Sequence, residues 1–201
     1  MMPALALVAA YLIGAIPFGF LLVKWKTGAD IRESGSGNTG ATNVLRTTGW
    51  KIGAATLVLD IAKGYFAVWL AGRLTDGSLG WMAAAALAVM AGHAFPVFLR
   101  GKGGKAVASF TGAFLYLTPL PLAATAVVFV VMVAATRYVS VGSVTGAGAF
   151  PLAVWLISHP PLPVMLAAIV SGAFIIYRHR DNWQRLRAGT ENVFSLRGSR
   201  R

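Results

Sequence analysis

The first apolar run of the chain, residues 3–23, reads PALALVAAYLIGAIPFGFLLV and is followed at once by Lys24, Trp25 and Lys26. At a rise of about 1.5 Å per residue, a helix of this length crosses the roughly 30 Å hydrocarbon core of a bilayer. Basic residues and tryptophan are typical of the membrane interface. This stretch therefore indicates an integral membrane protein.

Further apolar runs extend the same pattern along the chain. Hydrophobic residues make up 57% of the sequence and charged residues 12%, which is unlike a soluble domain. We predict an all-α integral membrane protein of about seven transmembrane helices that forms one domain over residues 1–201. The run at 106–118 is too short to cross the bilayer upright, so we expect a tilted half-helix or one arm of a hairpin. The runs after the first lie at about 50–72, 79–98, 106–118, 120–136, 143–158 and 162–177.

Arginine and lysine gather after the first, third, fifth and seventh runs. By the positive-inside rule these ends face the cytoplasm, so we expect the N-terminus outside and the C-terminus in the cytoplasm. The same assignment places every polar loop that could carry chemistry on one side of the membrane.

The composition also limits which partners and cofactors the protein can bind. The formal net charge is +12, but the basic residues flank apolar runs, which favours membrane lipids and phosphorylated substrates over nucleic acid. The chain has no cysteine, so thiolate catalysis and thiolate metal sites are excluded. Three histidines and six carboxylates argue against a metal cage. We expect neither a metal nor a cofactor, and the sequence does not indicate an oligomeric state.

The polar segment after the first run, residues 34–46, reads SGSGNTGATNVLR. Its glycines permit positive φ, so that successive N–H groups can converge on one oxyanion, and a helix is expected to begin within it. Arg46 can add a bidentate contact to phosphate. A flexible turn is the alternative, although a turn does not require this length or a closing arginine. The spacing differs from that of a nucleotide P-loop, so ATP is not inferred.

A second polar segment, RGKGGK at residues 100–105, holds three cations within six residues. Its glycines allow these cations to fold toward one or two phosphates. Positive-inside anchoring by snorkelling side chains is the alternative, and it fits Arg100 better than Lys105, which opens the next apolar run.

The third polar segment, residues 178–191, leaves the last apolar run. His179 and Asn182 are three residues apart and can share a helix face. His179 and His93 are both candidate bases near neutral pH, although a structural role is the alternative for each. A solvated juxtamembrane helix is the alternative for the segment as a whole.

An acidic and a basic residue lie in the interior of the second apolar run. Asp60 and Lys63 are one helical turn apart, and charges at membrane depth usually pair. We expect a mutual pair that supports the site, with a direct substrate role as the alternative. Farther along, Gly142 and Gly146 have the spacing of helix-packing residues, and Ser143 between them is expected to reach the cytoplasmic pocket.

Together the three polar segments resemble the three motifs of the bacterial acyl-phosphate glycerol-3-phosphate acyltransferases, the PlsY family. The resemblance matches Gly35–Arg46, Lys102–Ser109 and Asn182–Glu191, and by helix order it covers most of the chain. Departures are Ala106 and Ser109, where the family has glycine and threonine. Val193 stands where the family has lysine.

The resemblance implies transfer of a fatty acyl group from acyl phosphate to glycerol 3-phosphate, giving lysophosphatidic acid and phosphate in phospholipid biosynthesis. It also implies a multi-pass protein of the bacterial inner membrane whose active site faces the cytoplasm. Direct attack without a covalent acyl-enzyme is expected, because acyl phosphate is already activated. The donor's phosphate is the expected proton acceptor and His179 the alternative. A transporter or anion-binding protein for a phosphorylated solute is the alternative function.

The residues expected at the site fall into three groups. His179, Lys105 and Arg46 are the candidate catalytic residues, and Asp60, Lys63 and His93 the candidate supports. The tail arginines Arg197, Arg200 and Arg201 are expected to be dispensable. The residues expected to bind substrate are Ser36, Gly37, Asn38, Gly40, Thr42, Asn43, Arg46, Lys102, Gly103, Gly104, Lys105, Ser143, His179, Asn182 and Glu191.

Overall fold

The computed structural model describes residues 1–194, so that Arg197, Arg200 and Arg201 lie outside the described residues. Over that range every element of secondary structure is a helix, as we predict from the sequence. Its elements are α1 (Met2–Ala15), α2 (Phe18–Thr27), η1 (Ile31–Glu33), α3 (Ala41–Thr48), α4 (Trp50–Leu74), α5 (Leu79–Ala94), η2 (Val97–Leu99), α6 (Val107–Leu117), α7 (Pro119–Thr136), α8 (Val139–Ser158), α9 (Leu162–Arg178) and α10 (Arg180–Arg187).

Each predicted apolar run is helical, but the first is not one continuous helix. It breaks between α1 and α2, where Ile16 is extended with ψ 112°. Pro17 is the physical reason, because proline disfavours the α conformation in the residue before it and has no N–H to donate.

Five segments of the described chain are long and apolar enough to cross a membrane, counting α1 and α2 together. A sixth arises if α9 and α10, which are bent by 45°, form one span. Helix α6 has 11 residues and is the short fourth helix that the sequence predicts. A count of seven spans and the orientation of the termini therefore stay predictions.

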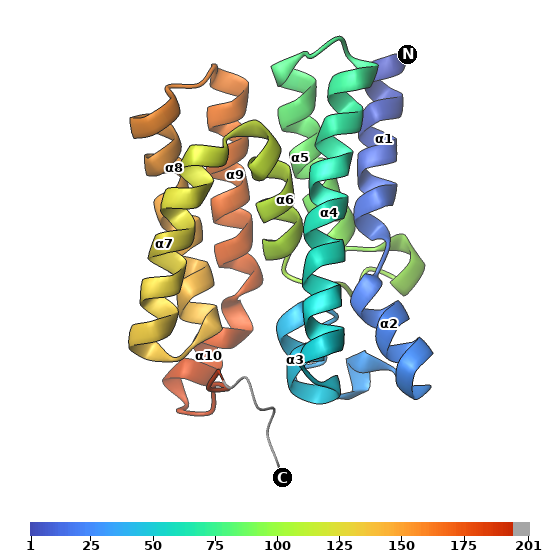
Figure 1. The fold of residues 1–201 in the computed structure, drawn as a ribbon, viewed down its shortest axis with the longest axis vertical. Helices are drawn as coiled ribbons and strands as arrows, with labels where there is room; N and C mark the ends of the chain where they lie inside the picture. Colours follow the sequence, from blue (N-terminus) through green and yellow to red (C-terminus); the bar gives the residue numbers. More distant parts are fainter. Residues whose placement is uncertain (195–201) are drawn as a thin grey trace.

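The helices form two groups with α6 between them (Figure 1). Helices α1, α4 and α5 pack on one side, α7, α8 and α9 on the other, and α6 contacts α4, α7 and α9. In the centre Phe150 of α8 meets Phe110 and Phe114 of α6, with ring centroids 4.8 Å and 4.7 Å apart. These buried aromatic edges join the two groups through α6.

Glycines allow the closest helix crossings. A Cβ at Gly112 of α6 would lie 1.8 Å from the Ile61 carbonyl oxygen of α4, and one at Gly64 would lie 2.1 Å from the Ser109 carbonyl oxygen. Small residues at membrane helix interfaces let backbones approach in this way. Gly142 of α8 also lies close to α7, as its spacing from Gly146 predicts: a Cβ there would lie 2.5 Å from Val133 Cγ2 and 2.9 Å from the Phe129 carbonyl oxygen.

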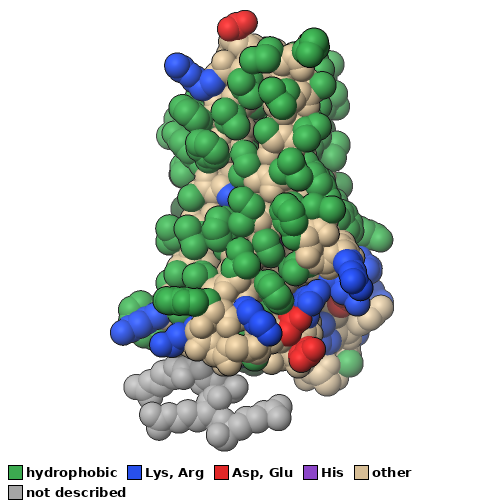
Figure 2. Space-filling view, turned by 90° about the vertical axis from the view of Figure 1, so that its right-hand side faces the viewer, with side chains coloured by type: hydrophobic (Ala, Val, Ile, Leu, Met, Phe, Trp, Pro, Cys, Tyr) green, Lys and Arg blue, Asp and Glu red, His purple; other side chains and the backbone are tan. Residues whose placement is uncertain are grey.

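Charged side chains gather at one end of the molecule. Figure 2 shows apolar side chains over most of the face and a band of Lys, Arg, Asp and Glu side chains toward the lower end of the view. Helices α2, α3 and α10 lie at this end (Figure 1). The molecule therefore presents its charged segments together, as a one-sided site requires.

Candidate active site

A cavity of about 1170 Å³ opens between α4 and α7 and reaches the charged end of the molecule. Residues of all three polar segments line its polar end, so segments far apart in the sequence meet in one site. The predicted site residues among its lining are Ser36, Asn38, Gly40, Thr42, Asn43, Arg46, Lys105, Ser143, His179, Asn182 and Glu191, together with Asp60 and His93 from the predicted supports.

The first segment is folded by its own amide side chains. Asn43 is buried, and its Oδ1 accepts from the Ser36 N–H at 2.9 Å. Its Nδ2 donates to the carbonyl oxygens of Ser34 at 3.0 Å and Asn38 at 2.9 Å. The amide of Asn43 is therefore committed to shaping the loop, whereas we expected it to contact substrate.

The predicted row of converging N–H groups is only partly present. Asn38 Oδ1 accepts from the Gly40 N–H at 2.8 Å, and the Ser36 N–H is likewise taken up. Gly37 turns the chain at φ +69° but does not line the cavity. Besides Arg46, the side-chain donors of this segment that line the cavity and bond no other described residue are the hydroxyls of Ser36 and Thr42 and the Nδ2 of Asn38.

Arg46 projects from α3 into the cavity and has no hydrogen-bond or ion-pair partner in the described part of the chain. Burial lowers its pKa, but an arginine stays protonated in proteins. A desolvated guanidinium with its donor fork unoccupied is suited to bind a phosphate with two parallel hydrogen bonds.

Lys105 reaches the same cavity from the segment before α6. Ala106 follows it at φ +64°, in the left-handed region that favours glycine. The ammonium of Lys105 donates to Asn182 Oδ1. Burial lowers the pKa of Lys105 to about 8, and the nearby charge of Arg185 contributes. The lysine therefore carries a poorly solvated positive charge that a phosphate can neutralise.

Glu191 anchors the network that holds Lys105. Asn182 Nδ2 donates to Glu191 Oε1 at 2.6 Å, and Ser140 Oγ donates to the same oxygen at 2.8 Å. Arg185 Nε donates to Glu191 Oε2 at 2.7 Å. Burial alone would raise the pKa of Glu191, but these hydrogen bonds outweigh it and hold the pKa below its ordinary value. The polar groups of Asn182 and Glu191 are therefore occupied by hydrogen bonds to neighbouring side chains.

His179 lies between α9 and α10 with its ring buried against the cavity. Its Nδ1 lies 2.8 Å from the Ile175 carbonyl oxygen, which can only accept, so Nδ1 carries the hydrogen and Nε2 the lone pair. Burial lowers the pKa of His179 to about 4, and the positive charge of Lys105 acts in the same direction. The ring is therefore neutral at neutral pH.

The predicted ion pair inside α4 is confirmed. Lys63 Nζ lies 2.8 Å from Asp60 Oδ1 and donates to the Ile16 carbonyl oxygen at 2.8 Å, where α1 breaks. His93 Nδ1 lies 3.0 Å from Ser109 Oγ, and that hydroxyl donates to the Asp60 carbonyl oxygen at 3.3 Å. These buried contacts connect α1, α4, α5 and α6 next to the first and second polar segments.

The second segment departs from expectation, because only Lys105 of its cations lines the cavity. Lys102 is exposed. Gly103 and Gly104 also lie outside the lining, since they pack against α5: a Cβ at Gly104 would lie 2.1 Å from His93 Nε2, and one at Gly103 2.2 Å from the His93 carbonyl oxygen. The two glycines therefore let the loop pack against His93, and residues 102–104, which we expected to bind substrate, do not line this cavity.

Some residues that line the cavity were not predicted from the sequence. Arg185 and Ser140 line the polar end and hold Glu191, and Arg137 lies at the end of α7. Arg185 is three residues after Asn182, so the shared helix face could have indicated it. Ser140 gave no signal, because its partner Glu191 lies on a distant segment.

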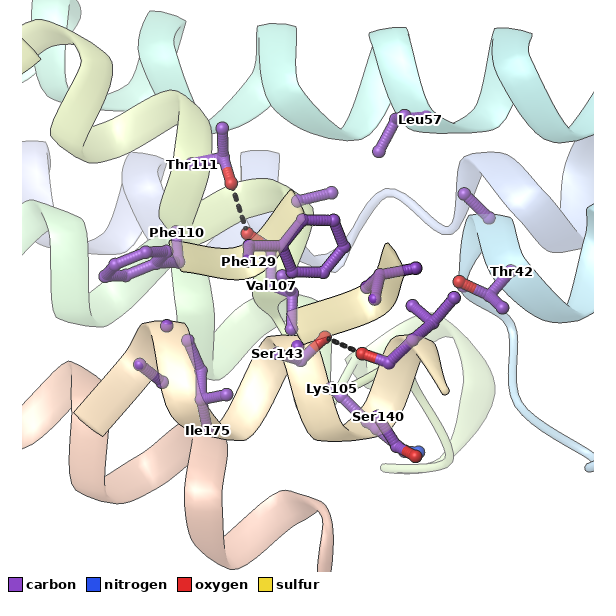
Figure 3. A pocket seen from close by; sticks show the side chains of 18 of the residues that line it. Thr42, Leu57, Lys105, Val107, Phe110, Thr111, Phe129, Ser140, Ser143 and Ile175 are labelled. Carbon is purple, nitrogen blue, oxygen red and sulfur yellow. Dashed lines mark hydrogen bonds between the residues drawn. The ribbon is translucent and has the colours of Figure 1, made fainter. Parts of the chain in front are cut away.

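The rest of the cavity is an apolar groove. Stripes of residues at helical spacing line it from α4, α6 and α7. Figure 3 shows Leu57 of α4, Val107 of α6 and Phe129 of α7 around the space above Ser143. Thr111 also lines the groove, but its hydroxyl donates to the Val107 carbonyl oxygen at 3.0 Å and so exposes no free donor. The groove is suited to a flexible hydrocarbon chain.

The family model described as glycerol-3-phosphate acyltransferase matches residues 4–189. The glycerol-3-phosphate acyltransferase of Geotalea daltonii is 46% identical over 188 residues, which is 94% of this chain and 95% of the relative. That of Geobacter sulfurreducens is 45% identical over 92% of this chain and 94% of the relative.

Two solved structures are similar over nearly the whole chain. The crystal structure of PlsY, an integral membrane glycerol 3-phosphate acyltransferase, in its glycerol 3-phosphate form aligns with a TM-score of 0.91 and 37% identity, covering 97% of this chain and 96% of the other. The lysophosphatidic acid form aligns with a TM-score of 0.87 and 35% identity, covering 98% and 97%.

Proposed function

The chain belongs to the glycerol-3-phosphate acyltransferase family, and we propose that it transfers a fatty acyl group from acyl phosphate to the sn-1 hydroxyl of glycerol 3-phosphate. The products are lysophosphatidic acid and inorganic phosphate. The two similar crystal structures are described as forms with glycerol 3-phosphate and with lysophosphatidic acid, the acceptor and the product of this reaction. Residues 1–201 act as one catalytic domain in this proposal.

The observation that supports the donor is the continuity of one cavity. Its polar end holds the cations Arg46 and Lys105, and its other end is an apolar groove lined from α4, α6 and α7. A substrate that fills both parts has a phosphate joined to a long hydrocarbon chain. Acyl phosphate has this form. Glycerol 3-phosphate brings a second phosphate into the site, which explains why the site carries more than one cation.

The proposed step is a direct attack. The acceptor's hydroxyl oxygen bonds to the acyl carbonyl carbon, and the bond from that carbon to the phosphate oxygen breaks. The phosphate leaves with the electron pair. Two phosphates must lie side by side in the complex, so Arg46 and Lys105 reduce their repulsion and orient them. The leaving group is already activated, so the chemistry requires no covalent acyl-enzyme.

The hydroxyl proton goes to an oxygen of the departing phosphate in this mechanism. A phosphate has its second pKa near 6, whereas the pKa of His179 is about 4. The phosphate is therefore the stronger base of the two. His179 Nε2 instead accepts a hydrogen bond from the acceptor and positions it.

The location of the site forms part of the proposal. The chain is a multi-pass membrane protein, and the gathering of its arginines and lysines at the end that holds α3 and α10 supports a cytoplasmic active site in the bacterial inner membrane. The mechanism uses no metal or cofactor. A transporter for a phosphorylated solute is not favoured, since the chain belongs to an acyltransferase family.

Purified protein in detergent tests the proposal. With palmitoyl phosphate and glycerol 3-phosphate, we expect stoichiometric release of phosphate and lysophosphatidic acid, and no phosphate release without the acceptor. Formation of the product from acyl-coenzyme A but not from acyl phosphate would refute the proposed donor. His179→Ala is expected to raise the KM for glycerol 3-phosphate, and restoration of kcat by added imidazole would instead identify His179 as the base.

A further inference from the structure

The apolar groove is open along one side. Leu57 on α4, Leu115 on α6 and Val130 on α7 all line it, and yet 45%, 44% and 60% of these residues' surface is exposed. Helices α4 and α7 form its walls, and the described chain places α6 between them as its floor. In a bilayer this open side faces lipid.

The groove extends along α7 from the polar end toward the turn after α6. Arg137 marks the polar end of α7, and Val133, Val130, Ala126 and Ala123 line the groove successively farther from it. These four positions repeat at three or four residues and so form one stripe of the helix. The last two are exposed alanines, so at these two positions of the stripe α7 presents only a methyl group to the groove. Leu122, which also lines the groove, is buried.

Resting on the proposed function, we propose that Ala123 and Ala126 determine the enzyme's tolerance for acyl-chain length, because they leave the groove open to the bilayer instead of closing it. The occupant is the fatty acyl chain of the donor, whose phosphate lies at the polar end of the same cavity. The first part of the chain lies on α6, and the remainder leaves between α4 and α7 into lipid.

The rise of α7 and the length of an extended acyl chain together give the number of carbons that reaches each alanine. Ala126 and Ala123 lie seven and ten residues from Val133, or about 10 Å and 15 Å along the helix. An extended hydrocarbon with bonds of about 1.52 Å and angles near 111° advances about 1.25 Å per carbon. A chain that enters at the level of Val133 therefore passes Ala126 after about eight carbons and Ala123 after about twelve.

Burial in the groove by itself gives little selectivity for length. Lipid tails are as apolar as the groove, so moving a methylene from bilayer to protein has little driving force. Selection then requires steric closure, which the alanines do not supply. The wild-type enzyme should use donors of about 12 to 18 carbons with kcat/KM values within about fivefold, a difference of about 1 kcal/mol.

The test is to close the groove at two depths and compare chain-length profiles. Ala126→Phe should lower the ratio of kcat/KM for the sixteen-carbon donor to that for the eight-carbon donor by at least about tenfold, equivalent to about 1.4 kcal/mol. Ala123→Phe should retain the twelve-carbon donor and lose efficiency only beyond it. Ala124→Phe is the matched control, because Ala124 is an exposed alanine of α7 outside the groove lining.

Each ratio is measured on one preparation, so loss of folded protein lowers both rates equally and leaves the ratio unchanged. A graded series of Val, Leu and Phe at Ala126 adds a dose response, with the ratio falling as the side chain grows. Wild-type profiles in both Ala123→Phe and Ala126→Phe, with acylation intact, would overturn the proposal. An inactive wild-type enzyme with every acyl phosphate would instead refute the proposed function.

Discussion

Arg46 and Lys105, two of the cations that line the cavity, differ in what surrounds them. The ammonium of Lys105 already has a partner in Asn182, whereas Arg46 has none among the described residues. Lys102 lies three residues before Lys105 in sequence but is exposed. Position relative to the cavity, and not charge alone, therefore decides which basic residue can bind phosphate.

Arg46→Ala is predicted to reduce kcat/KM for glycerol 3-phosphate by roughly one to two orders of magnitude, because a charge-assisted contact contributes about 1.5–3 kcal/mol. Arg46→Lys should restore only part of this, since an ammonium cannot form the two parallel bonds of a guanidinium. Lys102→Ala is the control and should change kcat/KM less than about fivefold. Equal losses in Arg46→Ala and Lys102→Ala would show that bulk charge, not a built pocket, binds the substrates. Steady-state rates on folded, detergent-purified protein decide between them.

The lowered pKa of Lys105 predicts a pH dependence. Its charged form, which binds phosphate, predominates below about pH 8 and is lost as pH rises through that value. Values of kcat/KM, which report the free enzyme, should therefore fall above about pH 8. Lys105→Arg should shift this fall upward beyond the measurable range, because arginine keeps its proton. An unchanged alkaline limb in Lys105→Arg would assign the titration to another group.

Helix contacts set the depth and width of the groove. Helix α6, its floor, lies against α4 at Gly64 and Gly112, where any Cβ would meet a backbone carbonyl. The α4–α6 crossing fixes the depth of the groove and also the position where α6 begins, next to Lys105. Packing of the two helices and geometry of the site are therefore coupled.

Gly112→Ala is predicted to destabilise the protein by about 1–3 kcal/mol, since the added methyl group would lie 1.8 Å from the Ile61 carbonyl oxygen and the helices must separate. For a chain of this size that corresponds to a fall of about 2–4 °C in Tm per kcal/mol. Gly148→Ala on α8 is the control, because its methyl group would meet nothing closer than Ile176 Cδ1 at 3.9 Å. Thermal unfolding in detergent measures both. Similar Tm values for the two variants would contradict a tight α4–α6 crossing.

The sequence was most informative where one segment acts alone. Apolar runs predicted the helices, and the spacing of Asp60 and Lys63 predicted their ion pair, since both are local properties of a helix. The outward turn of Lys102 was not predictable, because it depends on His93 of α5 contacting Gly104. The role of Ser140 depends on Glu191 in the same way. Contacts between distant segments were the main source of error.

At the scale of the whole molecule, the polar segments occupy one end and the bilayer-length helices the remainder. Glycerol 3-phosphate is a water-soluble dianion, whereas an acyl chain partitions into lipid. A site at the boundary between a charged end and a lateral groove lets each substrate arrive from its own phase. This arrangement requires the polar end to face the compartment that supplies the soluble substrate, which the positive-inside rule assigns to the cytoplasm.

Topology is tested by labelling single cysteines, which is simple because the native chain has none. Lys102→Cys and Arg187→Cys, both at exposed positions of the polar segments, should react with a membrane-impermeant maleimide in inside-out vesicles and resist it in right-side-out vesicles. Asp76→Cys, on the connection between α4 and α5 at the opposite end, should show the reverse pattern. The reason is the excess of arginine and lysine at the end that carries α2, α3 and α10. Labelling of Lys102→Cys and Arg187→Cys from opposite sides of the membrane would exclude a shared site. Labelling of both only from outside would contradict the proposed orientation, because the active site would then have no access to cytoplasmic glycerol 3-phosphate.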